Sequence, residues 1–207
     1  HEIKNPLTPI QLSAERIIRK FAPLLSNDSD ALQQMVEVIT RQTDDIRRIV
    51  DEFSKFARMP ELKRSNQDFC ALIESIISLQ KAGQPTVSIN FCKPETPVLI
   101  SVDATLINQA ITNILKNAGE AIETRISQNL NLKETGIIDV TLKENTESVT
   151  LTISDNGIGL PQDRSRLFEP YVTTREKGTG LGLAIVKKIV EEHGGILKLE
   201  DSSPLED

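Results

Sequence analysis

Two glycine-rich stretches, Asp155-Asn-Gly-Ile-Gly159 and Gly178-Thr-Gly-Leu-Gly-Leu183, decide how the second half of this chain folds. The first follows an alternating run at residues 148–154, which predicts a strand ending in a sharp turn. The second opens a helical pattern at residues 180–193. Backbone N–H groups at a helix start lie at the positive end of the helix dipole and favour phosphate. The order therefore favours a nucleotide pocket.

Asp155 is expected at a sheet edge, where its carboxylate can accept a hydrogen bond from an exocyclic amine such as that of adenine. Gly157 and Gly159 let the backbone turn and approach a flat ligand closely. The alternative is a simple turn, because this tripeptide is common in turns.

The second stretch predicts a phosphate site, with a plain loop and helix start as the alternative. Thr179 adds a hydroxyl donor, and Arg175 and Lys177 add positive charge. The expected backbone contacts come from Gly178, Thr179, Gly180, Leu181 and Gly182.

An upstream helix, predicted at residues 103–126, carries Asn113 and Asn117 one turn apart on one side. Neutral amide oxygens suit Mg²⁺, which keeps water and substrate phosphates in its shell. Glu120 could order a metal-bound water, and Lys116 could meet a phosphate. A solvated polar face is the alternative for this helix taken alone.

These three segments resemble the N, G1 and G2 boxes of the GHKL ATP-binding superfamily, and Leu167–Thr174 resembles its F box and lid. The resemblance covers about residues 68–200. It implies ATP held between a helix layer and the lid, with Asn117 as the main Mg²⁺ ligand, Asn113 beside it, and Asp155 contacting adenine. Thr174 is included among the lid contacts.

The first sixty residues show two helical periods. Apolar residues recur in steps of three and four over residues 1–22 and again over 32–57, with Pro23 and a polar run between them. Two helices cannot enclose a core, so we expect a second copy to complete an antiparallel four-helix bundle.

The opening run His1-Glu-Ile-Lys-Asn-Pro-Leu-Thr-Pro-Ile10 resembles the H box of sensor histidine kinases. The resemblance implies that His1 accepts a phosphoryl group from ATP and passes it to an aspartate of a response regulator. The carboxylate of Glu2 can accept a hydrogen bond from the other ring nitrogen of His1 and so fix its tautomer. Asn5 is associated in such families with phosphatase action on the regulator.

The sequences of the H box and of residues 169–195 look most like those of the nitrogen-regulation branch, of NtrY or NtrB type. This implies an NtrX- or NtrC-like regulator as partner. The chain shows no apolar run long enough for a bilayer and no signal peptide. We therefore expect this part in the cytoplasm, with any anchor at the bacterial inner membrane in segments upstream.

The expected fold is α+β, a helical hairpin followed by a GHKL (Bergerat-type) sandwich of one sheet and covering helices. The hairpin spans residues 1–59, a charged linker 60–67, and the ATP-binding domain 68–207, with its final strand seemingly truncated. The other elements are predicted as a helix at 68–82, strands at 86–92, 97–102 and 137–143, and a strand at 196–200.

Charge and cysteine content exclude some classes of function. The net charge of −6 argues against nucleic-acid binding, and Cys70 and Cys92 form no metal or disulfide framework. His193, before a glycine cap, has a structural role by this interpretation. Two alternatives to the kinase remain: a dimeric scaffold that binds ATP without transfer, and an anti-sigma-type GHKL serine kinase.

Overall fold

The computed structural model describes residues 6–25, 29–57, 61–83, 86–128, 135–164, 166–173 and 178–202. The chain forms two compact units, residues 1–60 and 61–207. Each unit is described by itself.

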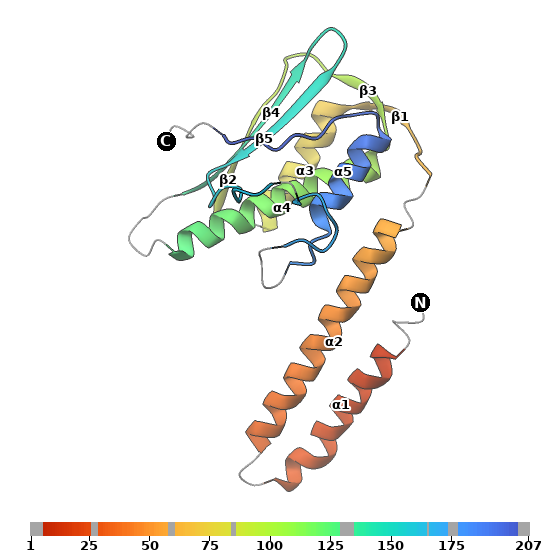
Figure 1. The fold of residues 1–207 in the computed structure, drawn as a ribbon, viewed down its shortest axis with the longest axis vertical. Coiled ribbons are helices and arrows are strands. Elements are labelled where there is room, and N and C mark those ends of the chain that lie inside the picture. Colours follow the sequence, from red (N-terminus) through yellow and green to blue (C-terminus); the bar gives the residue numbers. More distant parts are fainter. Residues whose placement is uncertain are drawn as a thin grey trace. The chain divides into compact units, whose positions relative to one another are not determined.

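The first unit is a helical hairpin (Figure 1) of helices α1 (Leu7–Phe21) and α2 (Ser29–Ala57), with the 3-10 turn η1 (Ala22–Leu24) after α1. Pro23 in η1 lacks a backbone N–H and helps to end the first helix. Among the residues of this unit whose burial is described, the buried ones are Leu7, Ala14, Val36 and Thr43. The predicted helical periods are therefore realised as a packed pair.

Much of the predicted apolar stripe stays exposed in the single chain. Its exposed members are Ile10, Ile17, Phe21, Met35, Ile39, Ile46 and Phe53. Two helices bury only the side chains between them, so the outer part of each stripe remains exposed to solvent.

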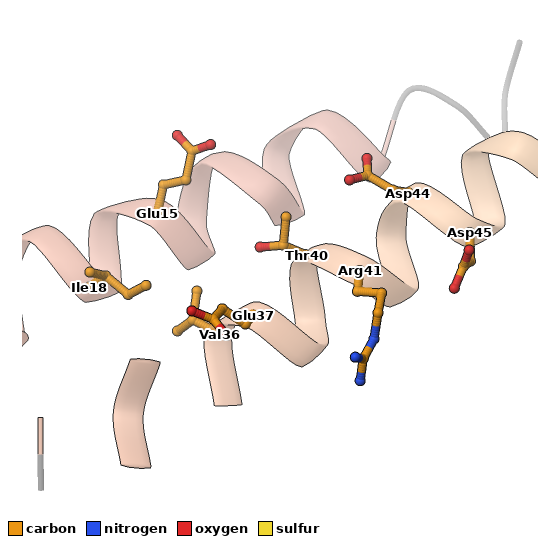
Figure 2. A pocket seen from close by; sticks show the side chains of 8 residues that line it. All are labelled: Glu15, Ile18, Val36, Glu37, Thr40, Arg41, Asp44 and Asp45. Carbon is orange, nitrogen blue, oxygen red and sulfur yellow. The ribbon is translucent and has the colours of Figure 1, made fainter. Parts of the chain in front are cut away.

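A shallow hollow of about 410 Å³ lies between α1 and α2 (Figure 2). Most of its lining residues are polar or charged by type: Glu15, Ile18, Val36, Glu37, Thr40, Arg41, Asp44 and Asp45. Beside it, Arg47 Nη2 donates to Gln11 Oε1 at 2.8 Å, which joins the two helices across their polar side.

The second unit contains five strands and three helices among its described residues. They are β1 (Ser65–Asp68), α3 (Phe69–Gly83), β2 (Val87–Cys92), β3 (Leu99–Val102), α4 (Ala104–Gln128), β4 (Gly136–Glu144), β5 (Val149–Asp155) and α5 (Gly182–Glu192). The predicted helices at 68–82, 103–126 and 180–193, and the strands before residue 155, are all present with small shifts at their ends.

The strands form two sheets, not the single sheet predicted. β2 pairs in parallel with β4, which pairs antiparallel with β5, and a separate pair joins β1 to β3. Side chains of β4 alternate, with Ile138, Val140 and Leu142 at most 2% exposed. Helices α3, α4 and α5 form a layer on one face of the three-stranded sheet (Figure 1), so the expected α+β sandwich is confirmed.

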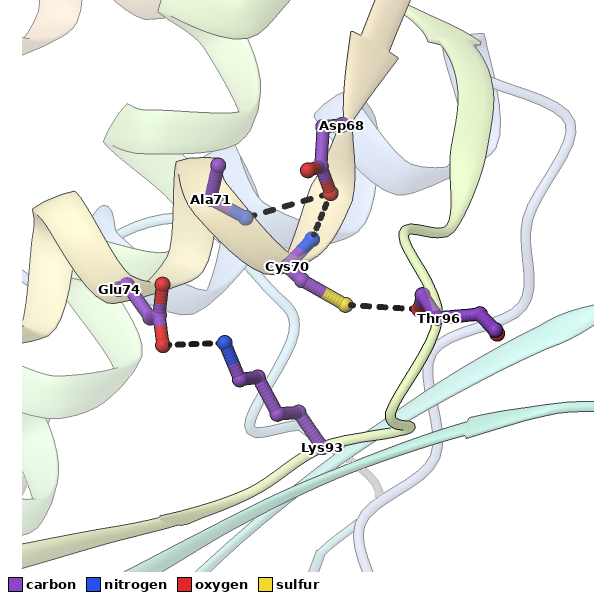
Figure 3. A network of polar contacts seen from close by, with 6 residues as sticks. All are labelled: Asp68, Cys70, Ala71, Glu74, Lys93 and Thr96. Atoms are coloured by element: carbon purple, nitrogen blue, oxygen red, sulfur yellow. Dashed lines mark hydrogen bonds and ion pairs between the residues drawn. The ribbon is translucent and has the colours of Figure 1, made fainter.

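The start of α3 is fixed by a local polar network (Figure 3). Asp68 Oδ1 accepts from the backbone N–H groups of Cys70 at 3.0 Å and Ala71 at 3.4 Å, as an N-cap residue does. Further along, Lys93 Nζ lies 2.6 Å from Glu74 Oε1, and this hydrogen bond raises the pKa of Lys93. Both contacts lie where α3 meets neighbouring segments.

Two further sequence expectations are wrong. The predicted linker at 60–67 includes most of β1, because Ser65–Asp68 pairs with β3 although its polar residues show no strand pattern. The predicted strand at 196–200 is irregular. Leu197 and Leu199 are half-buried there without strand pairing, so the alternation reflects side-chain burial alone.

Candidate functional site

Helix α4 lies at the centre of the candidate site. Its buried side, including Leu115, Ala118 and Ile122, faces the core, which leaves Asn113 and Asn117 half-buried on another side. Lys116 Nζ lies 3.9 Å from Glu120 Oε1, and both side chains are partly exposed. Such a pair stabilises a helix weakly.

The first glycine stretch lies against this helix. The N–H of Gly157 donates to Asp155 Oδ1 at 2.9 Å, and the N–H of Ile158 donates to the carbonyl of Ala121 at 3.3 Å. A side chain at Gly157 would place its Cβ 2.6 Å from Ala121 Cβ. Real carbon contacts are about 3.5–4.0 Å, so glycine is required for the turn to reach α4.

The second glycine stretch leads into α5, which begins at Gly182. Its N-cap is Leu181, whose apolar side chain is fully buried and cannot cap the first turn. A Cβ at Gly182 would lie 3.8 Å from Asn117 Nδ2, so the start of α5 lies beside the asparagine side of α4. The N–H of Leu181 donates to Thr179 Oγ1 at 3.4 Å.

A backbone contact between Tyr171 and Gly180, which the sequence did not predict, holds the segment before this helix. Tyr171 has a φ of +67°, rare for a non-glycine residue, and its N–H donates to the carbonyl of Gly180 at 3.1 Å. A Cβ on Gly180 would come within 2.6 Å of the Tyr171 backbone. A residue pattern gives no signal for this conformation, because it depends on the contact with Gly180.

Phe168 also contacts α5. The Lys187 ammonium lies 5.4 Å from the centroid of the Phe168 ring, within the range of a cation–π contact. Within the segment that resembles the F box, Phe168 therefore contacts α5 and Tyr171 contacts the loop that leads into it.

The structure brings four predicted residues onto one side of α4: Asn117 on the helix, Asp155 and Gly157 at the end of β5, and Gly182 at the start of α5. Gly159 (φ +77°) and Gly178 follow in the same two loops. The remaining predicted site residues lie outside the described residues: His1, Glu2, Asn5, Thr174, Arg175 and Lys177.

The described residues offer amide oxygens as ligands for a magnesium ion. Within the described ranges, no three His, Cys, Asp or Glu side chains gather where they could hold a metal. Mg²⁺ needs few protein ligands when substrate phosphates and water complete its shell, and amide oxygens suit it. Asn113 and Asn117, one turn apart and half-buried, match that donor set.

No helix among the described parts of the chain is both long and apolar enough to pass through a bilayer.

Two family profiles match the chain. The profile described as "Histidine kinase-, DNA gyrase B-, and HSP90-like ATPase" matches residues 102–205, which contain every described site residue. The profile described as "His Kinase A (phospho-acceptor) domain" matches residues 1–62, the helical hairpin.

Individual proteins are similar over nearly the whole chain. Nitrogen regulation protein NtrY of Azorhizobium caulinodans is 50% identical, over 98% of this chain and 26% of that protein. An NtrY-like protein of Rickettsia felis is 40% identical, over 96% of this chain and 32% of that protein. The chain thus spans about a quarter to a third of these relatives' length. The crystal structure of full-length ShkA in complex with AMPPNP shares the fold, with 23% identity, a TM-score of 0.67, and coverage of 94% of this chain and 40% of that one.

Proposed function

Because this chain belongs to the sensor histidine kinase family of two-component systems, in its NtrY-like branch, we propose that it phosphorylates its own His1 from ATP and passes the phosphoryl group to a response regulator. The first unit, residues 1–59 in the sequence prediction, supplies the phosphoacceptor and the dimer contact. The second unit, from about residue 68, binds the nucleotide.

One observation carries the proposal. Two glycine stretches that lie far apart from α4 in sequence both come to that helix, through Gly157 at Ala121 and Gly182 near Asn117. A residue with a side chain at either position would reduce the space beside α4. Backbone N–H groups at the start of α5, with no side-chain cap, suit the phosphates of a nucleotide.

The proposed contacts combine these positions with the sequence prediction. Asp155 accepts a hydrogen bond from the adenine amine, and Gly157 and Gly159 line the base. Phosphate contacts come from Lys116 and from the segment at residues 174–182. Of that segment, the proposed contact residues are Thr174, Arg175, Lys177, Gly178, Thr179, Gly180, Leu181 and Gly182.

The transfer step is an in-line substitution. A lone pair of one imidazole nitrogen of His1 forms a bond to the γ-phosphorus, and the bond from that phosphorus to the bridging oxygen breaks, which releases ADP. The proton on the other ring nitrogen is held by Glu2, which stabilises the positive charge that develops on the ring.

Asn117 and Asn113 would hold Mg²⁺, with Glu120 ordering a water of its shell. When bound, Mg²⁺ supplies charge neutralisation on the transferred phosphate. The chain's own contribution is to place amide oxygens on one side of α4, a rigid element packed by Leu115 and Ile122.

We propose two kinds of partner. The exposed apolar stripe of α1 and α2 favours a homodimer as a four-helix bundle, since a second copy would cover it. The receiving partner is the aspartate-bearing domain of a response regulator, NtrX-like or NtrC-like in this branch. Asn5 supports a phosphatase action on that regulator. We also propose that this part of the protein works on the cytoplasmic side, with the parent protein anchored at the inner membrane.

Incubation with γ-labelled ATP and Mg²⁺ tests the proposal. The protein should take up an acid-labile, base-stable phosphoryl group, found by mass spectrometry on the N-terminal peptide and lost in His1→Gln. Asn117→Ala should abolish labelling, whereas Asn108→Ala should retain it. Asn108 is the matched control because it lies on the same helix, exposed, and accepts from Thr112 Oγ1. Label that survives in His1→Gln would contradict the proposal.

A further inference from the structure

A polar cluster away from the nucleotide site holds the segment by which the chain enters the second unit. The members are Lys63, Arg64, Asp103 and His193, which come from the entering segment, the start of α4 and the end of α5. We call this set the junction clamp. None of these residues is used by the transfer chemistry proposed above.

Asp103 is the centre of the clamp and is only 7% exposed. Its Oδ1 accepts from the N–H groups of Thr105 at 3.0 Å and Leu106 at 3.1 Å, which caps α4. Its Oδ2 accepts from the N–H of Lys63 at 3.0 Å. The backbone N–H of Lys63, ahead of the other causes, lowers the pKa of this carboxyl. One side chain therefore joins the entering segment to α4.

His193 joins the same point to α5. Its Nε2 accepts from the N–H of Asp103 at 3.0 Å, so the ring proton is on Nδ1, which donates to the carbonyl of Ile189 at 2.8 Å. His193 is the C-cap residue of α5, in agreement with the structural role expected from sequence. Its ring links the end of one site helix to the start of the other.

Arg64 provides a second hold on α5. Its Nη2 donates to the carbonyl of Glu192 at 2.8 Å, where a cation also complements the negative end of the helix dipole. The next residues form β1, paired with β3 from Ser65 opposite Val102. The chain is thus seated from Lys63 onward on the two helices that carry Asn117 and Gly182.

We propose that Arg64 and His193 are positioning residues for phosphoryl transfer. They hold the entering segment on α4 and α5, which keeps the nucleotide site in a constant position relative to that segment. The inference rests on the proposed function. Loosening the clamp slows transfer to His1 and leaves nucleotide binding unchanged, because none of its side chains lies at the proposed nucleotide contacts. Small misplacements of reacting groups cost large factors in rate, and we expect a loss of about tenfold.

The test uses the full chain with γ-labelled ATP, comparing Arg64→Ala, His193→Asn and His193→Gln. The amide oxygen of glutamine can take the place of Nε2 and accept from Asp103, whereas asparagine is too short to do so. We expect Arg64→Ala and His193→Asn to slow labelling about tenfold, with the Kd for a non-hydrolysable ATP analogue unchanged. His193→Gln should recover most of the lost rate. Lys143→Ala, an exposed cation removed from β4, is the charge control.

The outcomes are separable. A wild-type chain that binds no nucleotide or takes no label overturns the proposed function, and this inference with it. A wild-type chain that is labelled, with Arg64→Ala and His193→Asn labelled at the same rate, overturns the clamp alone. Equal losses in His193→Asn and His193→Gln would also overturn it, because the Nε2 acceptor would then have no part in the effect.

Discussion

Replacing Gly157 by alanine should destabilise the second unit and weaken nucleotide binding together. The new Cβ would lie 2.6 Å from Ala121 Cβ and 2.8 Å from the Ala121 carbonyl carbon. Ordinary carbon contacts are about 3.5–4.0 Å, so the turn or α4 must shift by roughly 1 Å. Overpacking of this kind costs about 1–3 kcal/mol.

A further loss comes from the backbone. The hydrogen bond from Ile158 N–H to the Ala121 carbonyl, 3.3 Å long, would open as the turn moves away. Losing it adds about 0.5–1.5 kcal/mol, for a total of about 1.5–4.5 kcal/mol. The Kd for an ATP analogue should rise by about tenfold or more, because the same turn carries Asp155.

Urea unfolding followed by tyrosine fluorescence measures the effect in this unit alone. The chain has one tyrosine, Tyr171, and no tryptophan, so the signal comes from the second unit. Gly83→Ala is the matched control: a Cβ there meets nothing within 4 Å, and its unfolding free energy should stay within about 0.5 kcal/mol of wild type. If Gly157→Ala unfolds like Gly83→Ala, the packing argument is wrong.

Three other substitutions give separate checks. Gly182→Ala should weaken nucleotide binding without loss of stability, since its Cβ would be 3.8 Å from Asn117 Nδ2, an ordinary contact; a changed unfolding midpoint with unchanged Kd would contradict this. Asp103→Asn should be less stable than wild type at pH 7, because the folded state lowers the pKa of this carboxyl and so favours its ionised form. The stability that the carboxylate contributes is fully present at pH values above the ordinary pKa near 3.9, and it is lost as the pH falls through the lower pKa of the folded state. Urea titrations from pH 7 to 3 should show the gap closing at the acid end, and a constant gap would count against the linkage. Ile122→Ala, at a fully buried position, should cost about 2–5 kcal/mol in the same assay, and more than Ile126→Ala, whose side chain is partly exposed.

The chain's local patterns already determined much of this protein. The α+β class, the helical hairpin and the membership of the histidine kinase family follow from short motifs and periods, and all three are confirmed. Glycines at a turn and at a helix start reflect backbone demands that neighbouring residues set, so they can be identified without the tertiary structure. The asparagine side of α4 follows from helical periodicity in the same way.

Tertiary contacts alone decided the rest. Ser65–Asp68 is a strand because β3 pairs with it, although its own residues give no pattern. Residues 196–200 show the pattern and form no strand. The positive φ of Tyr171 depends on Gly180 across the loop. The junction clamp joins Asp103 to His193, ninety positions apart, and such long-range pairings arise only when the chain has packed.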